Sequence, residues 1–538
     1  MSTFGDYKAY KKFEPAYNGW KQNRDLADAK RLEYIKRHPE VRNKADIQRG
    51  QALLRAIDIM DEYSQKRAED MEVATESVIS MGLEGALFGG AALGALLSEF
   101  KPIKNFILKM SKGNKNSKLL AFAIPTVGGA ILGTLAAFPL MAWGAKAEVA
   151  ASRKGRFEAM RKELNHPNNF AVLTDEEIKE AKEKSKSIKL KEDEKKPIFE
   201  FAKGLKTIKD MVLDSKEYKA QRKQFEAELA DDMQNLDKEM TAEEIEAAKR
   251  DQQLLTKLVE KIDIASQDYA ENAEMATQTA ILTVGAAGGA FSLLLNKILN
   301  ALKIKSAGKI SAITNIISVA AMLGTGIFAA QIQKQASRVG RYKVKQELLK
   351  NPDNFVYIDD EKINEIKDVE VKPTKKEGMF KFLKTAWKNN KEFEKYKKTT
   401  AKEEKQLAQY IETMKLSPEQ VKEAKKLQKN TFRTFNKIDE NSQKYAESVE
   451  AIGQAAEFPI GLICTGIGAA VGLPYLMKNP KSQIEAVENF AKYLGAVILS
   501  TLPSIGINAY ITKQQKKASR IADMTAINEM NDYRMFRG

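Results

Sequence analysis

The sequence predicts an all-α polytopic membrane protein with three tandem repeats, each holding a two-helix transmembrane hairpin and long polar linker helices. Three observations predict it. The tripeptide Ala-Ser-Arg occurs three times, with its serines at 152, 337 and 519, which are 185 and 182 residues apart (337 − 152 and 519 − 337). Two long apolar segments precede each tripeptide. The chain between these pairs is rich in Lys and Glu, as solvated helices are.

The six apolar segments are each about 20 residues or longer, enough at ~1.5 Å per residue to cross a hydrocarbon layer of ~30 Å. Short loops, the first two of them strongly basic, join the members of each pair, which predicts antiparallel hairpins. Burial inside a large soluble protein, or storage of the hairpins for later insertion, is the alternative. The expected segments are 78–97 with 119–145, 276–296 with 310–331, and 458–477 with 493–512.

Small residues recur at four-residue spacing in these segments and predict close packing of helix backbones. One acid, Glu84, falls inside the first segment, where a relay role or a late helix start are the two interpretations. We favour the late start, since the other hairpins offer no acid at matching depth. The predicted packing glycines are Gly85, Gly89, Gly90, Gly94, Gly129, Gly133, Gly468 and Gly472.

The polar parts repeat as well. Residues 151–180 align without a gap on 336–365, which predicts a basic helix leaving the hairpin, a break at the shared proline, a short extended run and a new helix. The third copy is expected to stop before this break. Thr174 with Glu177 has the spacing of a capping box that opens the new helix, and Asp359 can cap the second copy.

Matching segments also precede each hairpin. Capping-box patterns begin at Thr241 and Ser417, and a Ser-Gln pair follows at 266–267 and 442–443, with 64–65 as the first copy. These matches predict a long helix that enters each hairpin. The expected organisation is 1–76 polar and helical, 77–145 hairpin, 146–275 linker, 276–331 hairpin, 332–457 linker, 458–512 hairpin and 513–538 basic helix.

Groups that carry catalysis are scarce. The chain has two histidines and one cysteine, Cys464, and the cysteine lies among apolar residues. A zinc site, a histidine acid–base pair and a reactive thiol are therefore not expected. We predict no enzyme activity, no cofactor and no metal.

The net charge of +16 favours anionic partners, and its distribution beside the apolar blocks favours lipid headgroups over nucleic acid. A protein partner, or self-association through the linker helices, is the other expected contact. Termini and linkers are expected on the cytoplasmic side of a multi-pass membrane protein. The residues predicted to contact headgroups are Lys146, Arg153, Lys154, Arg156, Arg338, Arg341, Lys513, Lys516, Lys517 and Arg520.

The sequence carries no family resemblance specific enough to name. The function it favours is a non-enzymatic membrane scaffold or organising protein, whose basic linker helices contact lipid headgroups or partner proteins. Two alternatives stay open. One is a transporter or channel with pseudo-threefold repeats, and the other is a soluble protein that inserts into membranes as a pore-forming or lytic agent.

Overall fold

The computed structural model describes residues 3–64, 100–110, 153–190, 239–301, 336–369, 391–439, 516–530 and 532–537, with residues 220–225, 227–228 and single positions between 371 and 514. Within these ranges every regular element is an α-helix or a 3-10 helix, and no strand occurs. The all-α part of the predicted fold is therefore confirmed.

The membrane part of the prediction is wrong. Among the residues that the structure describes, no helix is both long enough and apolar enough to cross a bilayer. Helix α8 (Ala242–Ala301) has the length, but its described side chains are largely those of a polar bundle helix, with Lys257, Glu260 and Lys261 in ion pairs. This finding overturns the polytopic fold class and the multi-pass membrane localisation with its cytoplasmic linkers.

The six apolar segments lie almost entirely outside the described residues. The exception is 276–296, whose backbone is part of α8. There the structure replaces a predicted boundary between linker and hairpin at residue 276 with one continuous 60-residue helix. No break is required because Ala and Leu, the two commonest residues of this stretch, favour helix, and no proline interrupts it.

Three equivalent helices, which we name the core helices, stand at the centre of the bundle. They are residues 44–64 in copy 1, the first half of α8 in copy 2, and residues 418–439 in copy 3. The predicted capping boxes open two of them. Thr241 and Glu244 exchange bonds of 2.9 and 3.2 Å, and Ser417 and Gln420 exchange bonds of 3.0 and 3.2 Å, so each side chain satisfies a backbone N–H that the helix leaves open.

A second set of helices, the exit helices, begins at or near each Ala-Ser-Arg and covers residues 153–163, 336–350 and 516–529. The first two end before a proline, and the 3-10 helices η2 (Pro167–Phe170) and η4 (Pro352–Phe355) follow. Extended residues and a capped helix come next: α5 (Asp175–Ser185), opened by the predicted Thr174–Glu177 box, and α10 (Asp360–Glu365), capped by Asp359.

The third copy does not stop before this turn, contrary to the prediction. Helix 516–529 is followed by η5 (Tyr533–Phe536), which begins on Asp532 instead of a residue preceding proline. Its Phe536 is buried to the same degree as Phe170 and Phe355, all at most 2% exposed. We call η2, η4 and η5 the aromatic turns. The third was missed because it lacks the proline, although Asp532 caps it through the N–H of Arg534 (3.0 Å).

The copies pack in a cycle. Phe170 of copy 1 meets Phe432 of the copy 3 core helix edge to face, with ring centroids 5.7 Å apart. Phe355 of copy 2 lies on Gly50 of the copy 1 core helix. The turn η5 of copy 3 packs on α8, the core helix of copy 2. Each exit segment therefore docks on the core helix of the preceding copy, and copy 1 closes the cycle on copy 3.

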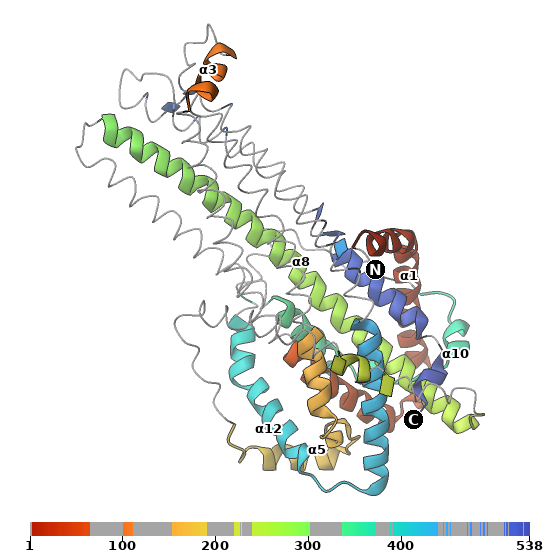
Figure 1. The fold of residues 1–538 in the computed structure, drawn as a ribbon. Helices are drawn as coiled ribbons and strands as arrows, with labels where there is room; N and C mark the ends of the chain where they lie inside the picture. The colour runs from red at the N-terminus through yellow and green to blue at the C-terminus, as the bar shows by residue number, and fades with distance from the viewer. Residues whose placement is uncertain are drawn as a thin grey trace.

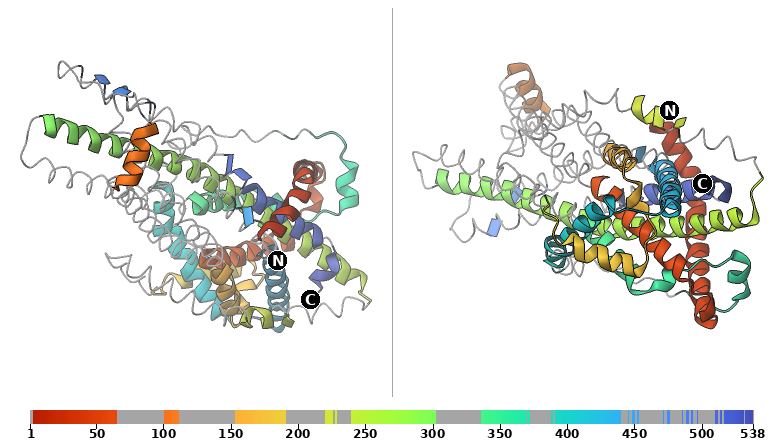
Figure 2. Two further views of the ribbon diagram at one scale, coloured as in Figure 1. Left: turned by 45° about the horizontal axis from the view of Figure 1, so that its top comes forward. Right: turned by 90° about the horizontal axis from the view of Figure 1, so that it is seen from below.

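Outer helices cover this bundle. Helix α1 (Thr3–Arg37) packs on α10, and the 3-10 turn η1 (Pro39–Val41) leads from it into the first core helix. Helix α12 (Thr400–Glu412) packs on α5 and η2. Helix α8 leaves the bundle and runs toward the far end of the molecule, where α3 (Lys101–Met110) lies (Figure 1). The views from other sides keep α8 as the long axis, with both chain ends on the bundle (Figure 2).

Candidate functional site

The core helices bring one aspartate from each copy into a common cluster. Asp61, Asp263 and Asp439 occupy the same position, three residues before the serine of each Ser-Gln pair. Asp61 and Asp439 are only 5% and 6% exposed, and Asp263 is partly buried. Carboxylates at this depth need nearby cations or bound protons, because burial strongly disfavours the ionised form.

Two arginines from the exit helices supply the cations. Arg156 and Arg341 are equivalent, five residues after the alanine of Ala-Ser-Arg. Arg156 forms an ion pair with Asp439 and lies 3.6 Å from an oxygen of Asp61, while Arg341 lies 2.9 Å from the other Asp61 oxygen. Copy 1 is thereby tied to copy 3, and copy 2 to copy 1, in the same cyclic order as the aromatic turns.

The third copy breaks this pattern. At the position of Arg156 and Arg341 it has Asp523, which is 8% exposed and accepts a hydrogen bond of 3.2 Å from Gln267 of α8. Next to it, Arg520 pairs with Asp268 and donates to Gln267 at 3.1 Å. The cluster has three equivalent positions on the core helices and three on the exit helices. These six positions hold four carboxyl groups and two guanidinium groups, so acids outnumber cations there.

The pKa values follow from burial first and from these neighbouring charges second. Burial, and then the charge of Asp61, raise the pKa of Asp263 to about 6, although Arg341 and Arg156 oppose the shift. Burial also raises the pKa of Asp439, against the pull of Arg156. For Arg156, burial favours the neutral form, but the carboxylates of Asp439 and Asp61 outweigh it and the pKa rises. Burial therefore favours the protonated form of both Asp263 and Asp439.

A second set of repeated polar contacts surrounds the aromatic turns. Arg55, Lys257 and Arg433 each stand six residues before the cluster aspartate of their own core helix. Each donates to a backbone carbonyl next to the buried phenylalanine of its own copy: Arg55 to Ala171 at 2.9 Å, Lys257 to Asn354 at 3.1 Å, and Arg433 to Met535 at 3.0 Å. Carbonyls left open by the short turns are satisfied in this way.

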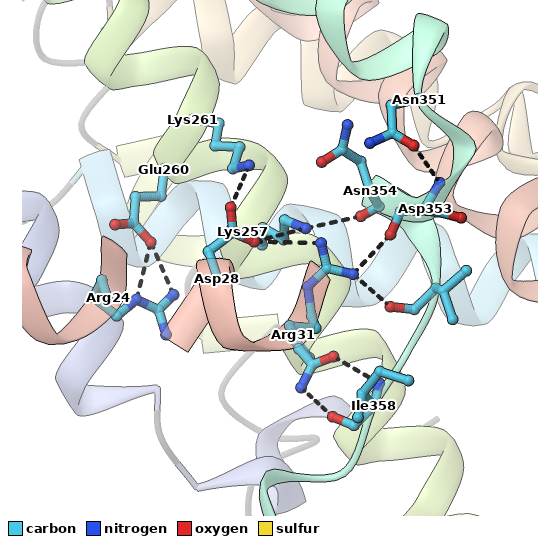
Figure 3. Close-up of polar contacts among 12 residues, drawn as sticks. Arg24, Asp28, Arg31, Lys257, Glu260, Lys261, Asn351, Asp353, Asn354 and Ile358 are labelled. Carbon is cyan, nitrogen blue, oxygen red and sulfur yellow. Dashed lines mark hydrogen bonds and ion pairs between the residues drawn. The ribbon is translucent and has the colours of Figure 1, made fainter. Parts of the chain in front are cut away.

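Copy 2 shows how α1 strengthens this arrangement (Figure 3). Asp28 lies between Lys257 and Lys261, at 3.0 and 2.6 Å, and also accepts from Arg31 at 3.3 Å. Arg31 then donates to the carbonyls of Asp353 and Val356, at 2.8 and 2.9 Å. Burial lowers the pKa of Arg31, and Asp28 counteracts the shift. The network fixes η4 between α1 and α8.

The structure places the predicted headgroup residues in several settings. Arg156 and Arg341 lie in the buried cluster, Arg520 pairs with Asp268, and Lys517 pairs with Glu14 of α1 at 3.0 Å. Lys513 is exposed. Arg153, Lys154, Arg338 and Lys516 are partly buried and take part in further contacts. Outside the described residues lie Lys146, Glu84, and all the predicted packing glycines, namely Gly85, Gly89, Gly90, Gly94, Gly129, Gly133, Gly468 and Gly472.

Sequence reasoning missed the aspartate set. The signal was available, because Asp61, Asp263 and Asp439 keep a fixed distance from the Ser-Gln pairs. The substitution at Asp523 was also readable from the alignment on Ala-Ser-Arg. Within the described residues no group of three or more His, Cys, Asp or Glu side chains is arranged to hold a metal ion. The cluster pairs carboxylates of the core helices with guanidinium groups of the exit helices.

Comparison with known proteins adds no relative, since no family model, no curated protein and no solved structure matches the chain.

Proposed function

We propose that the chain is a non-enzymatic organising scaffold, in which three tandem copies build one helical bundle whose exposed basic side chains bind an anionic partner. The observation that carries the proposal is what the repeated polar residues contact. Arg55, Lys257 and Arg433 hold the aromatic turns, and Arg156 and Arg341 join neighbouring copies. Polar contacts that recur in all three copies at the aromatic turns, and in two copies at the arginine position, thus serve assembly, which is what a scaffold requires.

The partner contact rests on the charge left on the outside. The chain has 88 Lys and Arg against 72 Asp and Glu, and three acids of the bundle, Asp28, Asp61 and Asp439, form internal ion pairs. Lysines on helix 391–398 and on α12 project from the outer layer, in which α12 packs on α5 and η2. Four exposed members form what we name the outer lysine set: Lys395, Lys397, Lys398 and Lys402.

Lysines of this kind fit anionic groups, and their attraction to a charged surface reaches about a Debye length, ~8 Å at physiological ionic strength. Phospholipid headgroups and acidic protein faces both present such groups. Binding of this type requires no catalytic residue in the bundle. It also agrees with the many exposed lysines on helices that keep their own internal packing, such as α12 with its buried Leu407 and Ile411.

The test is a binding assay on the full chain with three probes: vesicles containing phosphatidylserine, vesicles of phosphatidylcholine alone, and a poly-glutamate resin. We expect retention on at least one anionic probe, none on neutral vesicles, and loss of retention in 0.5 M salt. Reversing the outer lysine set to glutamate should weaken retention at least tenfold. A variant with Lys184→Glu and Lys186→Glu, which reverses exposed lysines at the C-terminal end of α5, is the matched control.

The two anionic probes separate the two partner classes. Retention on phosphatidylserine vesicles but not on the resin assigns the contact to lipid headgroups, and the reverse assigns it to acidic protein. If the charge-reversed variant and the control bind as the parent does, or if neutral vesicles bind equally well, the proposed function is wrong.

A further inference from the structure

One buried position of the exit helices carries an acid in copy 1 alone. Seven residues after Arg156 and its equivalents, the three copies hold Glu163, Leu348 and Met530, each at most 2% exposed. The backbone carbonyls of Glu163 and Met530 both accept from equivalent glutamines of the core helices. Copy 1 therefore buries a carboxyl group where the other copies bury an apolar side chain. Such burial is costly, and the packing of the other two copies shows that the bundle does not require it.

This carboxyl group is joined to α12 of copy 3 through one side-chain amide. Asn169 of η2, itself 2% exposed, donates through Nδ2 to Oε2 of Glu163 at 2.6 Å and to Oε1 of Glu412 at 3.3 Å. Glu412 is the last residue of α12. The two distances hold the carboxyl oxygens within ~6 Å of each other, where like charges disfavour each other's ionisation.

The second oxygen of Glu163 makes the ionised form still less favourable. This oxygen, Oε1, is buried and has no hydrogen-bond partner among the described residues. An ionised Glu163 would thus face the carboxylate of Glu412 with half of its own charge left without a donor. A protonated Glu163 removes the repulsion and keeps Oε2 as the acceptor for Asn169.

The neighbouring elements supply the other groups that act on Glu163. Lys162 lies on the same helix and donates to Tyr63 of core helix 44–64 at 2.8 Å, and Gln428 of core helix 418–439 is a neutral amide. His166, just before η2, has Nδ1 at 3.7 Å from Oε2 of Glu412. Burial raises the pKa of Glu163 most strongly, and Glu412 adds to the rise, while the Asn169 bond, Lys162 and His166 oppose it without cancelling it.

The contact acts on one end of α12. There Asn168 donates to the carbonyls of Glu412 and Met414, at 3.3 and 2.9 Å, so the last turn of α12 lies directly on η2. Closer to the middle of the helix, Gln406 donates to the carbonyl of Ile188 at 2.6 Å. The first turns of α12 are therefore held by contacts that do not involve Glu163.

We propose that the contact between Glu163, Asn169 and Glu412 is a pH-sensitive joint between copies 1 and 3: a proton on Glu163 keeps the last turn of α12 on η2, and loss of this proton loosens that turn. The device belongs to copy 1, because Leu348 and Met530 cannot titrate. It does not depend on the proposed binding of an anionic partner.

The direction of the effect follows from the charge balance. The pKa of Glu163 is raised above the ordinary glutamate value of ~4.3, so the folded state binds this proton more tightly than the unfolded state. The stability that the proton provides is fully present below pH ~4.3 and is lost as the pH rises through the raised pKa.

The experiment measures hydrogen exchange of α12 in the full chain between pH 4.5 and 8, corrected for the intrinsic pH dependence of exchange. In the parent, protection of residues 409–412 should fall about threefold or more as the pH rises, while residues 403–406 keep theirs. Glu163→Gln imitates the uncharged form and should keep the last turn protected at pH 8. Glu163→Leu installs the residue type of copy 2 and should do the same.

Two controls separate Glu163 from its surroundings. Glu180→Gln removes an exposed acid of α5, and His166→Asn installs the residue that copy 2 has at position 351. Both should retain the parent's loss of protection. The proposal is wrong if the last turn of the parent shows no such loss, if Glu163→Gln retains it, or if His166→Asn abolishes it. Should the glutamine variant fail to fold, Glu163→Leu decides by the same criterion.

Discussion

Gly50 and Phe355 lie so close that a Cβ atom on residue 50 would come within 2.6 Å of the ring carbon Cγ. The equivalent positions in the other core helices hold Gln252 and Gln428, eleven residues before the cluster aspartate. Those glutamines donate to the carbonyls of Met530 and Glu163 of the docked exit helix. In copy 1 the glycine at this position makes no such hydrogen bond through a side chain, and the Phe355 ring packs directly against it.

This contact gives the first prediction. Gly50→Ala should destabilise the chain by about 1–3 kcal/mol, since the Phe355 ring, 0% exposed, has little room to move. The measurement is the urea midpoint at fixed pH. Gly19→Ala is the control, because nothing lies within 4 Å of the added atom on α1, and alanine there should be neutral or stabilise by up to ~1 kcal/mol. Equal effects at both sites would contradict the close contact.

The buried ion pair between Arg156 and Asp439 gives the second. Arg156→Leu should cost about 3–5 kcal/mol, because it leaves buried carboxylates without their cation. The double variant Arg156→Leu with Asp439→Leu should recover part of that loss. For comparison, Lys184→Leu breaks an exposed pair with Glu180 and should change stability by less than ~1 kcal/mol. Additive single and double variants would show that the two groups do not interact.

The third prediction concerns the turn that the sequence pattern did not include. Phe536→Ala should destabilise the chain by about 3–5 kcal/mol, as should Phe170→Ala, since both rings are fully buried in the same cluster. Phe106→Ala on α3, where the ring is 64% exposed, is the control and should have little effect on thermal unfolding. A small effect at Phe536 alone would mean that η5 is not an equivalent part of the third copy.

Helix capping gives the fourth. Thr241→Ala should cost about 1 kcal/mol through loss of the cap on α8, since the N–H of Glu244 loses its acceptor. Thr399→Ala is a matched control at the start of α12, where the threonine makes no side-chain cap. Both are read from denaturant midpoints. A larger loss for Thr399 than for Thr241 would contradict the capping assignment.

The helical elements were predictable from the sequence because their signals are local. Thr174 and Thr241 have side chains that reach only three residues along the chain, and proline ended two exit helices where expected. The aromatic turn of copy 3 was not predictable in this way, because it begins at a capping aspartate, Asp532, where the other two turns begin at a proline. The charged cluster joins residues such as Arg156 and Asp439, 283 positions apart, and no local pattern reports such pairing.

The membrane prediction failed for a related reason. Apolar length alone does not predict a membrane hairpin, because an apolar stretch can also continue a helix that begins in a polar bundle, as α8 does without a break at residue 276. Charge alone predicts headgroup contact for the basic residues after each apolar pair. Several of them, Arg341 among them, instead neutralise acids that the sequence order keeps far away.

The closing of copy 1 on copy 3 has a consequence for how the chain is made. During synthesis, Phe170 and Arg156 emerge long before Phe432 and Asp439, so the first copy cannot complete its packing until the last core helix has left the ribosome. Contacts of such sequence separation slow folding and leave intermediates with unburied apolar surface. A nascent chain arrested at residue 400 should therefore be far more sensitive to protease within copy 1 than the finished chain.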